Sequence, residues 1–185
     1  MLKKVKQRKE SGFTIIEVLI VLAIAGLILL VVLLAVPALQ RNGRNTTVKN
    51  DASAIAGGIS DFESNNSGAT PTGGTLTNGT LALKTASISN GATAKVQGST
   101  KVNGVGSGTV TFATTTVPTT TSASAGALYV DSGESCQQTN GTAPTKSSRA
   151  FAVYFWTESP GITAGVDAVT GINNGAGLKG QCLDT

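Results

Sequence analysis

The most constraining feature of this chain is an apolar run, residues 13–39, in which only Thr14 and Glu17 have polar side chains. A helix rises about 1.5 Å per residue, so the run would reach about 40 Å and cross a hydrocarbon core of about 30 Å. We therefore predict a transmembrane helix here, with Gly26 and Pro37 as backbone irregularities.

Glu17 is unexpected in a simple membrane anchor, because inserting a carboxylate into the apolar region is unfavourable. Residues 1–12 hold five of the chain's 14 lysines and arginines, and such a cluster keeps its end of a membrane span in the cytoplasm. Cleavage between Gly12 and Phe13 would create an α-amino group near Glu17. Because an ion pair is strong in a low dielectric, this amine would make Glu17 an assembly sensor.

An ordinary secretory signal peptide is the competing interpretation, with residues 1–12 as its basic region and a small-residue cleavage site at residues 36–38. Two features oppose it: the apolar run exceeds the usual length of about 7–15 residues, and Glu17 lies near its start. An uncleaved single-pass anchor has the same difficulty with Glu17.

The net charge of +4 comes from the N-terminal segment. Without residues 1–12 the chain has nine basic and nine acidic side chains and is formally neutral. The basic pI is therefore poor evidence for nucleic-acid binding, and Lys84, Lys95 and Lys101 are better explained as solvated surface residues than as a DNA-attracting strip.

Residues 40–67 continue the helix in amphipathic form, since apolar residues recur there every three or four positions. The stripe consists of Val48, Ala52, Ile55, Ile59 and Phe62. We predict one long helix, kinked at Pro37, that ends near residue 63, before Asn65-Asn66-Ser67-Gly68.

Residues 68–185 are rich in Gly, Ser and Thr but low in charge, and short alternating patches predict a β-rich domain rather than a linker. Strands are expected at about 108–117, where Val110, Phe112 and Thr114 share one face, at 126–131 and at 149–157. The last strand alternates two aromatic-rich faces and should form the centre of the core against the helix stripe. The fold class is thus α+β, a long kinked helix on a small antiparallel sheet. Turns are predicted at four Asn-Gly pairs: Asn78-Gly79, Asn90-Gly91, Asn103-Gly104 and Asn140-Gly141.

The segment Ser11-Gly12-Phe13-Thr14-Ile15-Ile16-Glu17-Val18-Leu19-Ile20 resembles the processing site of type IV prepilins, the class III signal shared with pseudopilins. The resemblance implies a pilin-like fold, a leader of residues 1–12, cleavage by a prepilin peptidase after Gly12, methylation of Phe13 and a registering role for Glu17. Gly26 matches a family position, whereas Pro37 lies about one turn later than the family's helix-kinking proline. Any helix melting would thus fall between Gly26 and Pro37.

The resemblance implies a structural subunit, the major pilin of a type IV pilus. It would be a single-pass precursor in the cytoplasmic membrane and then part of a helical homopolymer on the cell surface that serves adhesion, twitching motility or DNA uptake. An assembly ATPase and its platform protein are the implied machinery. A pseudopilin of type II secretion, a minor pilin and a monomeric membrane-anchored adhesin remain as alternatives.

Cys136 and Cys182 are the only cysteines. An even pair in an oxidising compartment favours a disulfide, and the alternative is two unpaired buried thiols. Its position also resembles the C-terminal disulfide loop of type IV pilins.

The sequence contains no histidine, which disfavours the common catalytic triads and metal sites, so neither catalysis nor a cofactor is expected. Asp131, Glu134, Asp167 and Asp184 would bind Ca²⁺ only if the fold gathered them, and solvated surface charge is the better explanation.

Overall fold

The computed structural model describes most of the chain in two compact units, residues 1–40 and 41–185, which are considered separately. Within these units the described residues are 12–89, 91–98, 100–112, 125–136, 146–166, 173–174 and 176–184. The predicted turns at Asn90 and Asn140 and the position of Thr114 lie outside them.

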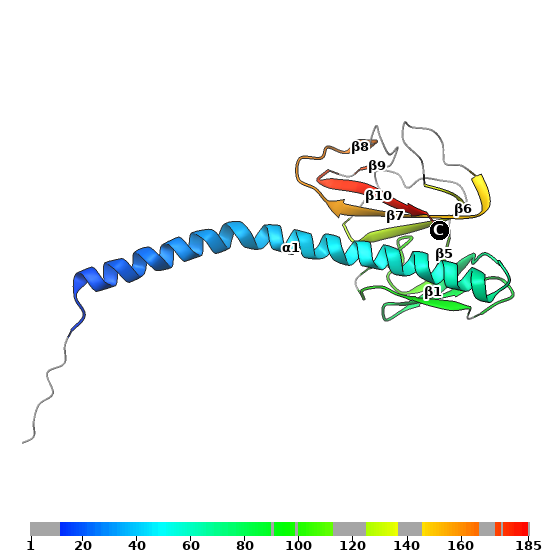
Figure 1. The fold of residues 1–185 in the computed structure, drawn as a ribbon, viewed down its shortest axis with the longest axis horizontal. Helices are drawn as coiled ribbons and strands as arrows, with labels where there is room; N and C mark the ends of the chain where they lie inside the picture. Colours follow the sequence, from blue (N-terminus) through cyan, green and yellow to red (C-terminus); the bar gives the residue numbers. More distant parts are fainter. Residues whose placement is uncertain are drawn as a thin grey trace, which may run out of the picture. The chain divides into compact units, whose positions relative to one another are not determined.

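Helix α1 runs without interruption over 51 residues, Ile15–Asn65, and Pro37 lies inside it (Figure 1). Proline has no N–H, so one backbone hydrogen bond is missing at this point. The predicted kink at Pro37 stays a prediction. The predicted start near Phe13 was two residues early, because Phe13 and Thr14 precede the first helical turn.

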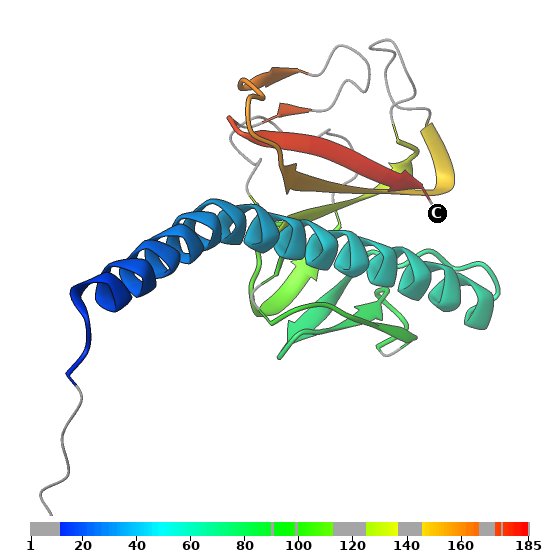
Figure 2. The same ribbon diagram turned by 60° about the vertical axis from the view of Figure 1, so that its left-hand side comes forward.

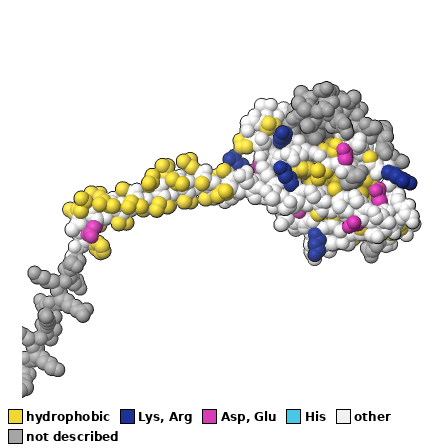
Figure 3. Space-filling view, in the orientation of Figure 1, with side chains coloured by type: hydrophobic (Ala, Val, Ile, Leu, Met, Phe, Trp, Pro, Cys, Tyr) yellow, Lys and Arg dark blue, Asp and Glu magenta, His cyan; other side chains and the backbone are white. Residues whose placement is uncertain are grey.

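The part of α1 in the first unit exposes its apolar side chains, which cover it in Figure 3. Leu33 and Leu34, for example, are 73% and 74% exposed. By length and composition α1 is able to cross a membrane, a criterion that signal sequences also meet.

The second half of α1 buries one stripe, as the periodicity predicts. Its buried residues are Val48, Asp51, Ala52, Ile55, Gly58, Ile59 and Phe62. Gly58 belongs to the stripe because a Cβ there would lie 3.1 Å from the Cβ of Ala94. The helix ends one turn before Gly68, which has a φ of +78° and whose N–H donates to the Glu63 carbonyl at 2.8 Å.

The first sheet is antiparallel, with strand order β3-β2-β1-β5. Its strands are β1 (Gly73–Thr77), β2 (Thr80–Lys84), β3 (Ala92–Lys95) and β5 (Gly108–Thr111). The predicted turn at Asn78-Gly79 joins β1 to β2, and positive φ values of 48° and 74° at these two residues suit a tight hairpin.

The second sheet has the order β10-β7-β6-β4. Its strands are β4 (Lys101–Val102), β6 (Ala127–Glu134), β7 (Lys146–Glu158) and β10 (Leu178–Asp184). A two-stranded sheet, β8 (Gly165–Val166) with β9 (Asn173–Asn174), completes the described strands. The expectation of one wholly antiparallel sheet was therefore too simple, because two main sheets form and β4 pairs with β6 in parallel.

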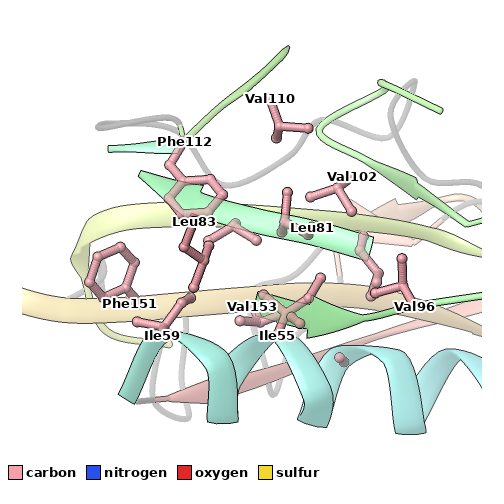
Figure 4. Close-up of a cluster of buried hydrophobic side chains, with 14 of the residues drawn as sticks. Ile55, Ile59, Leu81, Leu83, Val96, Val102, Val110, Phe112, Phe151 and Val153 are labelled. Atoms are coloured by element: carbon pink, nitrogen blue, oxygen red, sulfur yellow. The ribbon is translucent and has the colours of Figure 1, made fainter. Parts of the chain in front are cut away.

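The main core lies where both sheets meet the second half of α1 (Figures 1 and 2). Ile55 and Ile59 of α1 lie beside Leu83 of the first sheet and Phe151 and Val153 of the second (Figure 4). The predicted α+β class, one long apolar N-terminal helix packed with antiparallel sheets in a pilin-like arrangement, is confirmed.

Strand β7 presents two buried faces, as its alternating pattern predicts. Phe151, Val153 and Phe155 belong to the main core, whereas Ala152, Tyr154 and Trp156 form a second cluster. The Trp156 ring meets that of Tyr129 edge-on, with centroids 5.6 Å apart. The observed strand is longer than the predicted one at both ends.

Asn103 joins the two main sheets through its side chain. Its Nδ2 donates to the Thr111 carbonyl at 2.8 Å and to the Val130 carbonyl at 3.1 Å, while its Oδ1 accepts from the Val130 N–H at 2.7 Å. The predicted turn at Asn103-Gly104 is confirmed, but these bonds give Asn103 a second role that the dipeptide does not reveal.

Two neighbouring residues of α1 bind the end of β7. The Arg44 guanidinium donates to both carboxylate oxygens of Glu158, with Nε–Oε1 at 2.6 Å and the second contact at 2.8 Å. The side chain of Asn45 exchanges two hydrogen bonds with the Glu158 backbone at 3.0 and 2.7 Å. These contacts fix residues 44–45 to the second sheet.

The Arg44–Glu158 pair should make the stability of the folded protein depend on pH. Its hydrogen bonds lower the pKa of Glu158 in the folded protein, so its contribution is complete above the unfolded pKa of about 4.3 and is lost as pH falls through the folded value. Glu158→Gln should lower the thermal midpoint by at most about 2–4 °C at pH 7, because the Arg44 side chain is 56% exposed and solvent weakens the pair. Thermal unfolding measured at pH 7 and at successively lower pH tests this: the difference between wild type and variant should shrink as pH falls below the unfolded pKa and through the folded one.

Candidate functional site

The first candidate site is the segment that precedes and opens α1. Gly12 and Phe13 are outside the helix, and Phe13 is 88% exposed. The predicted scissile bond between them thus precedes the first helical residue, Ile15, by two positions. Residues 1–11 of the predicted leader lie outside the described part of the chain.

Thr14 and Glu17 form a capping box at the start of α1. The Thr14 N–H and hydroxyl donate to Oε2 of Glu17 at 3.1 and 2.9 Å, and the Glu17 N–H donates to the Thr14 hydroxyl at 3.3 Å. A Thr at the N-cap with a Glu three residues later satisfies backbone donors that the first turn leaves unpaired. The pattern was present in the sequence, where Thr14 was noted only as a polar exception.

These bonds orient the Glu17 carboxylate but do not neutralise it. Thr14 is uncharged, and the sequence has no Lys or Arg from residue 12 to residue 40. A counter-ion must therefore come from the leader, from a new amine at Phe13 or from another molecule. The geometry makes Glu17 an exposed, pre-oriented acceptor at the end of an apolar helix.

Removing the Thr14 hydroxyl should loosen the helix start. An N-cap side chain contributes about 0.5–2 kcal/mol, so Thr14→Ala should speed amide exchange at Glu17 and Val18 by about 2- to 30-fold. Hydrogen exchange of the detergent-solubilised chain measures this, and Thr14→Ser, which keeps a hydroxyl, should exchange as the wild type does. Equal protection in the alanine variant would show that the capping box does not hold the first turn.

Gly26 and Pro37 lie within the helical part of the first unit. Both are part of continuous α1, and a Cβ added at Gly26 would meet nothing within 4 Å. Packing within the chain therefore does not explain why position 26 is a glycine, and a role in helix melting stays a prediction.

The second candidate site is a disulfide between Cys136 and Cys182, whose Cα atoms are 5.8 Å apart. Cys136 follows β6 and Cys182 lies in β10, opposite Tyr154 of β7. In the sheet β7 lies between β6 and β10, and the bond connects β10 with the segment that follows β6. It lies beside the second aromatic cluster.

The expectation that the acids considered for Ca²⁺ are solvated surface charges was wrong for Asp131 and Glu134, which the strand packing leaves 2% and 4% exposed. Both lie near the buried Tyr154. Burial raises the pKa of its hydroxyl, and the charges of Asp131, Glu134 and Asp184 raise it further. Among the described residues, however, the one group of three ligand atoms within 4.8 Å is Cys136, Cys182 and Asp184. Since both sulfurs belong to the disulfide, that group is not a calcium site, and Asp167 lies outside the described residues.

The three lysines considered for nucleic-acid binding are not brought together. Lys84 pairs with Gly73 and Lys95 with Thr80, which places them at opposite ends of β2. Lys101 belongs to β4 of the other sheet. The three lysines therefore lie on three different strands, and nucleic-acid binding through them stays without support.

Comparison with known proteins identifies the N-terminal segment. Residues 7–33 match the family described as the prokaryotic N-terminal methylation motif, the class III signal peptide of type IV pilins. No curated protein and no solved structure matches the chain. The motif points to a structural subunit of the pilin and pseudopilin class, and it implies peptidase processing and polymerisation.

Proposed function

We propose that this chain is the precursor of a type IV pilin, and that the mature protein is the major subunit of a pilus. The observation that carries the proposal is the Glu17 carboxylate, which opens an exposed apolar helix and has no cation from residue 12 to residue 40. The methylation motif over residues 7–33, which includes Glu17 and the start of the apolar helix, supports it.

The precursor is inserted with residues 1–12 in the cytoplasm and residues 13–39 in the membrane. The five basic residues of the leader hold the N-terminus inside. The 40–67 half of the helix and the 68–185 domain are outside. A prepilin peptidase cleaves between Gly12 and Phe13, and Phe13 is methylated.

Polymerisation replaces contacts with lipid by contacts between helices. The exposed apolar side chains of the first unit pack on neighbouring subunits, and the Phe13 amine of one subunit pairs with Glu17 of another. Close pairing in a low-dielectric surrounding gives this contact its strength. An assembly ATPase and a platform protein extract the subunits from the membrane, and the segment between Gly26 and Pro37 loses helical hydrogen bonds as the fibre extends.

The 68–185 domain faces the environment, where it serves adhesion, twitching motility or DNA uptake. Its outer side chains include the threonines of β1 and β5, Thr75, Thr77, Thr109 and Thr111. A minor pilin would have the same N-terminus but a low abundance in sheared fibres. A type II secretion pseudopilin also shares the motif, but the disulfide favours the pilus subunit.

Mass spectrometry of the mature N-terminus tests the proposal. We expect a chain that begins at N-methyl-Phe13 when the precursor is expressed with a prepilin peptidase. An inactive peptidase serves as the control and should leave the precursor intact. A mature chain that begins at Leu39 or retains Met1 in the presence of active peptidase contradicts the proposal and favours a signal peptide or a monomeric anchored adhesin.

A further inference from the structure

The disulfide has a carboxylate beside it. A carboxylate oxygen of Asp184 and the sulfurs of Cys136 and Cys182 all lie within 4.8 Å of one another. Oδ1 of Asp184 accepts a hydrogen bond from the Cys136 backbone N–H. This bond holds the carboxylate near the sulfurs although Asp184 itself is exposed.

The same side of the sheet carries further negative charge. Tyr154 lies opposite Cys182 in the β7–β10 register, and the charges of Asp131 and Glu134, together with that of Asp184, raise its pKa. The two cysteines are half-buried and Asp184 is exposed, so a small thiol that reaches the disulfide meets the Asp184 carboxylate.

Reduction of a disulfide begins with a negatively charged reagent. A thiolate attacks one sulfur, forms a mixed disulfide and displaces the other sulfur as a thiolate. A second reagent thiolate then attacks the mixed disulfide, which releases the oxidised reagent and leaves two reduced cysteines. A fixed carboxylate close to the sulfurs repels each of these anions and disfavours the displaced thiolate.

We propose that Asp184 is a charge filter for the Cys136–Cys182 disulfide, slowing exchange with thiols and discriminating most strongly against anionic ones of the glutathione class. Like charges about 5 Å apart in water repel enough to slow attack about fourfold at low salt. Additional negative charge on the reagent increases the effect, and a cationic group on the reagent reduces it. The inference is independent of whether the chain polymerises.

The test compares three thiols on the full chain in a neutral detergent: glutathione, 2-mercaptoethanol and cysteamine. Second-order rates at equal thiolate concentration are measured by alkylation and mass spectrometry. Asp184→Asn keeps an oxygen to accept from the Cys136 N–H but removes the charge. We expect its rates to rise about four- to tenfold with glutathione, about fourfold with 2-mercaptoethanol and less than about twofold with cysteamine. In 1 M salt, where the screening length is about 3 Å, these differences should collapse.

Asp61→Asn is the matched control, because Asp61 is an exposed acid on α1. It should leave all three rates unchanged. Equal acceleration of Asp184→Asn with the three thiols, or acceleration that persists in 1 M salt, would mean that the substitution loosens the loop, and the proposal would be wrong. Unchanged rates at low salt would overturn it as well.

Discussion

Replacing Glu17 with Gln should reduce sheared fibres by more than about tenfold, while the precursor is still inserted and processed. Glutamine is close to glutamate in size and keeps an oxygen for the Thr14 contacts, so the loss isolates the charge. In the proposed fibre every subunit contact then leaves a buried amine unpaired, and an unpaired buried charge is strongly unfavourable.

Immunoblots of membrane and sheared fractions measure this result. Asp61→Asn removes an exposed acid from the same helix and should leave fibre yield unchanged. Glu17→Asp keeps the charge on a shorter side chain and should retain part of the assembly. If the glutamine variant forms as many fibres as the wild type, the counter-ion mechanism is wrong; if neither protein forms fibres, the monomeric alternative is favoured.

The second large effect is expected from removing the disulfide. The two cysteines are 46 positions apart, and in the chain-entropy model a closed loop of that length stabilises the fold by about 4 kcal/mol. The double variant Cys136→Ser, Cys182→Ser should lose about that amount, because its unfolded chain is no longer constrained by the loop. The enclosed segment includes β7, which supplies residues to both core clusters.

Urea unfolding of the detergent-solubilised chain, followed by tryptophan fluorescence, measures the loss. Trp156 is fully buried beside the disulfide and is the only tryptophan, so its emission follows this region. The wild type under reducing conditions is the control and should unfold as the double variant does. A difference below about 1 kcal/mol between the oxidised wild type and the variant would show that strand pairing alone stabilises the loop.

Local patterns predicted much of the fold because they depend on neighbours along the chain. The stripe from Val48 to Phe62 follows from helical periodicity, and the two faces of β7 follow from strand alternation. The capping box could also have been predicted from the sequence, since Thr14 and Glu17 have the required spacing. By contrast, the partners of β4 were not predictable, because a two-residue strand has no periodicity to indicate its neighbour.

The sequence by itself determined the N-terminal site, since an apolar run, its single acid at Glu17 and the basic leader act through composition and spacing. Only the tertiary structure decided how distant polar groups meet: Asn103 with both sheets, Arg44 with Glu158, and Asp184 with the disulfide. Such contacts depend on strand order and register, which place residues far apart in the chain within hydrogen-bonding distance. Side-chain periodicity indicates which face of a helix or strand a residue occupies, but not which distant residue it will contact there.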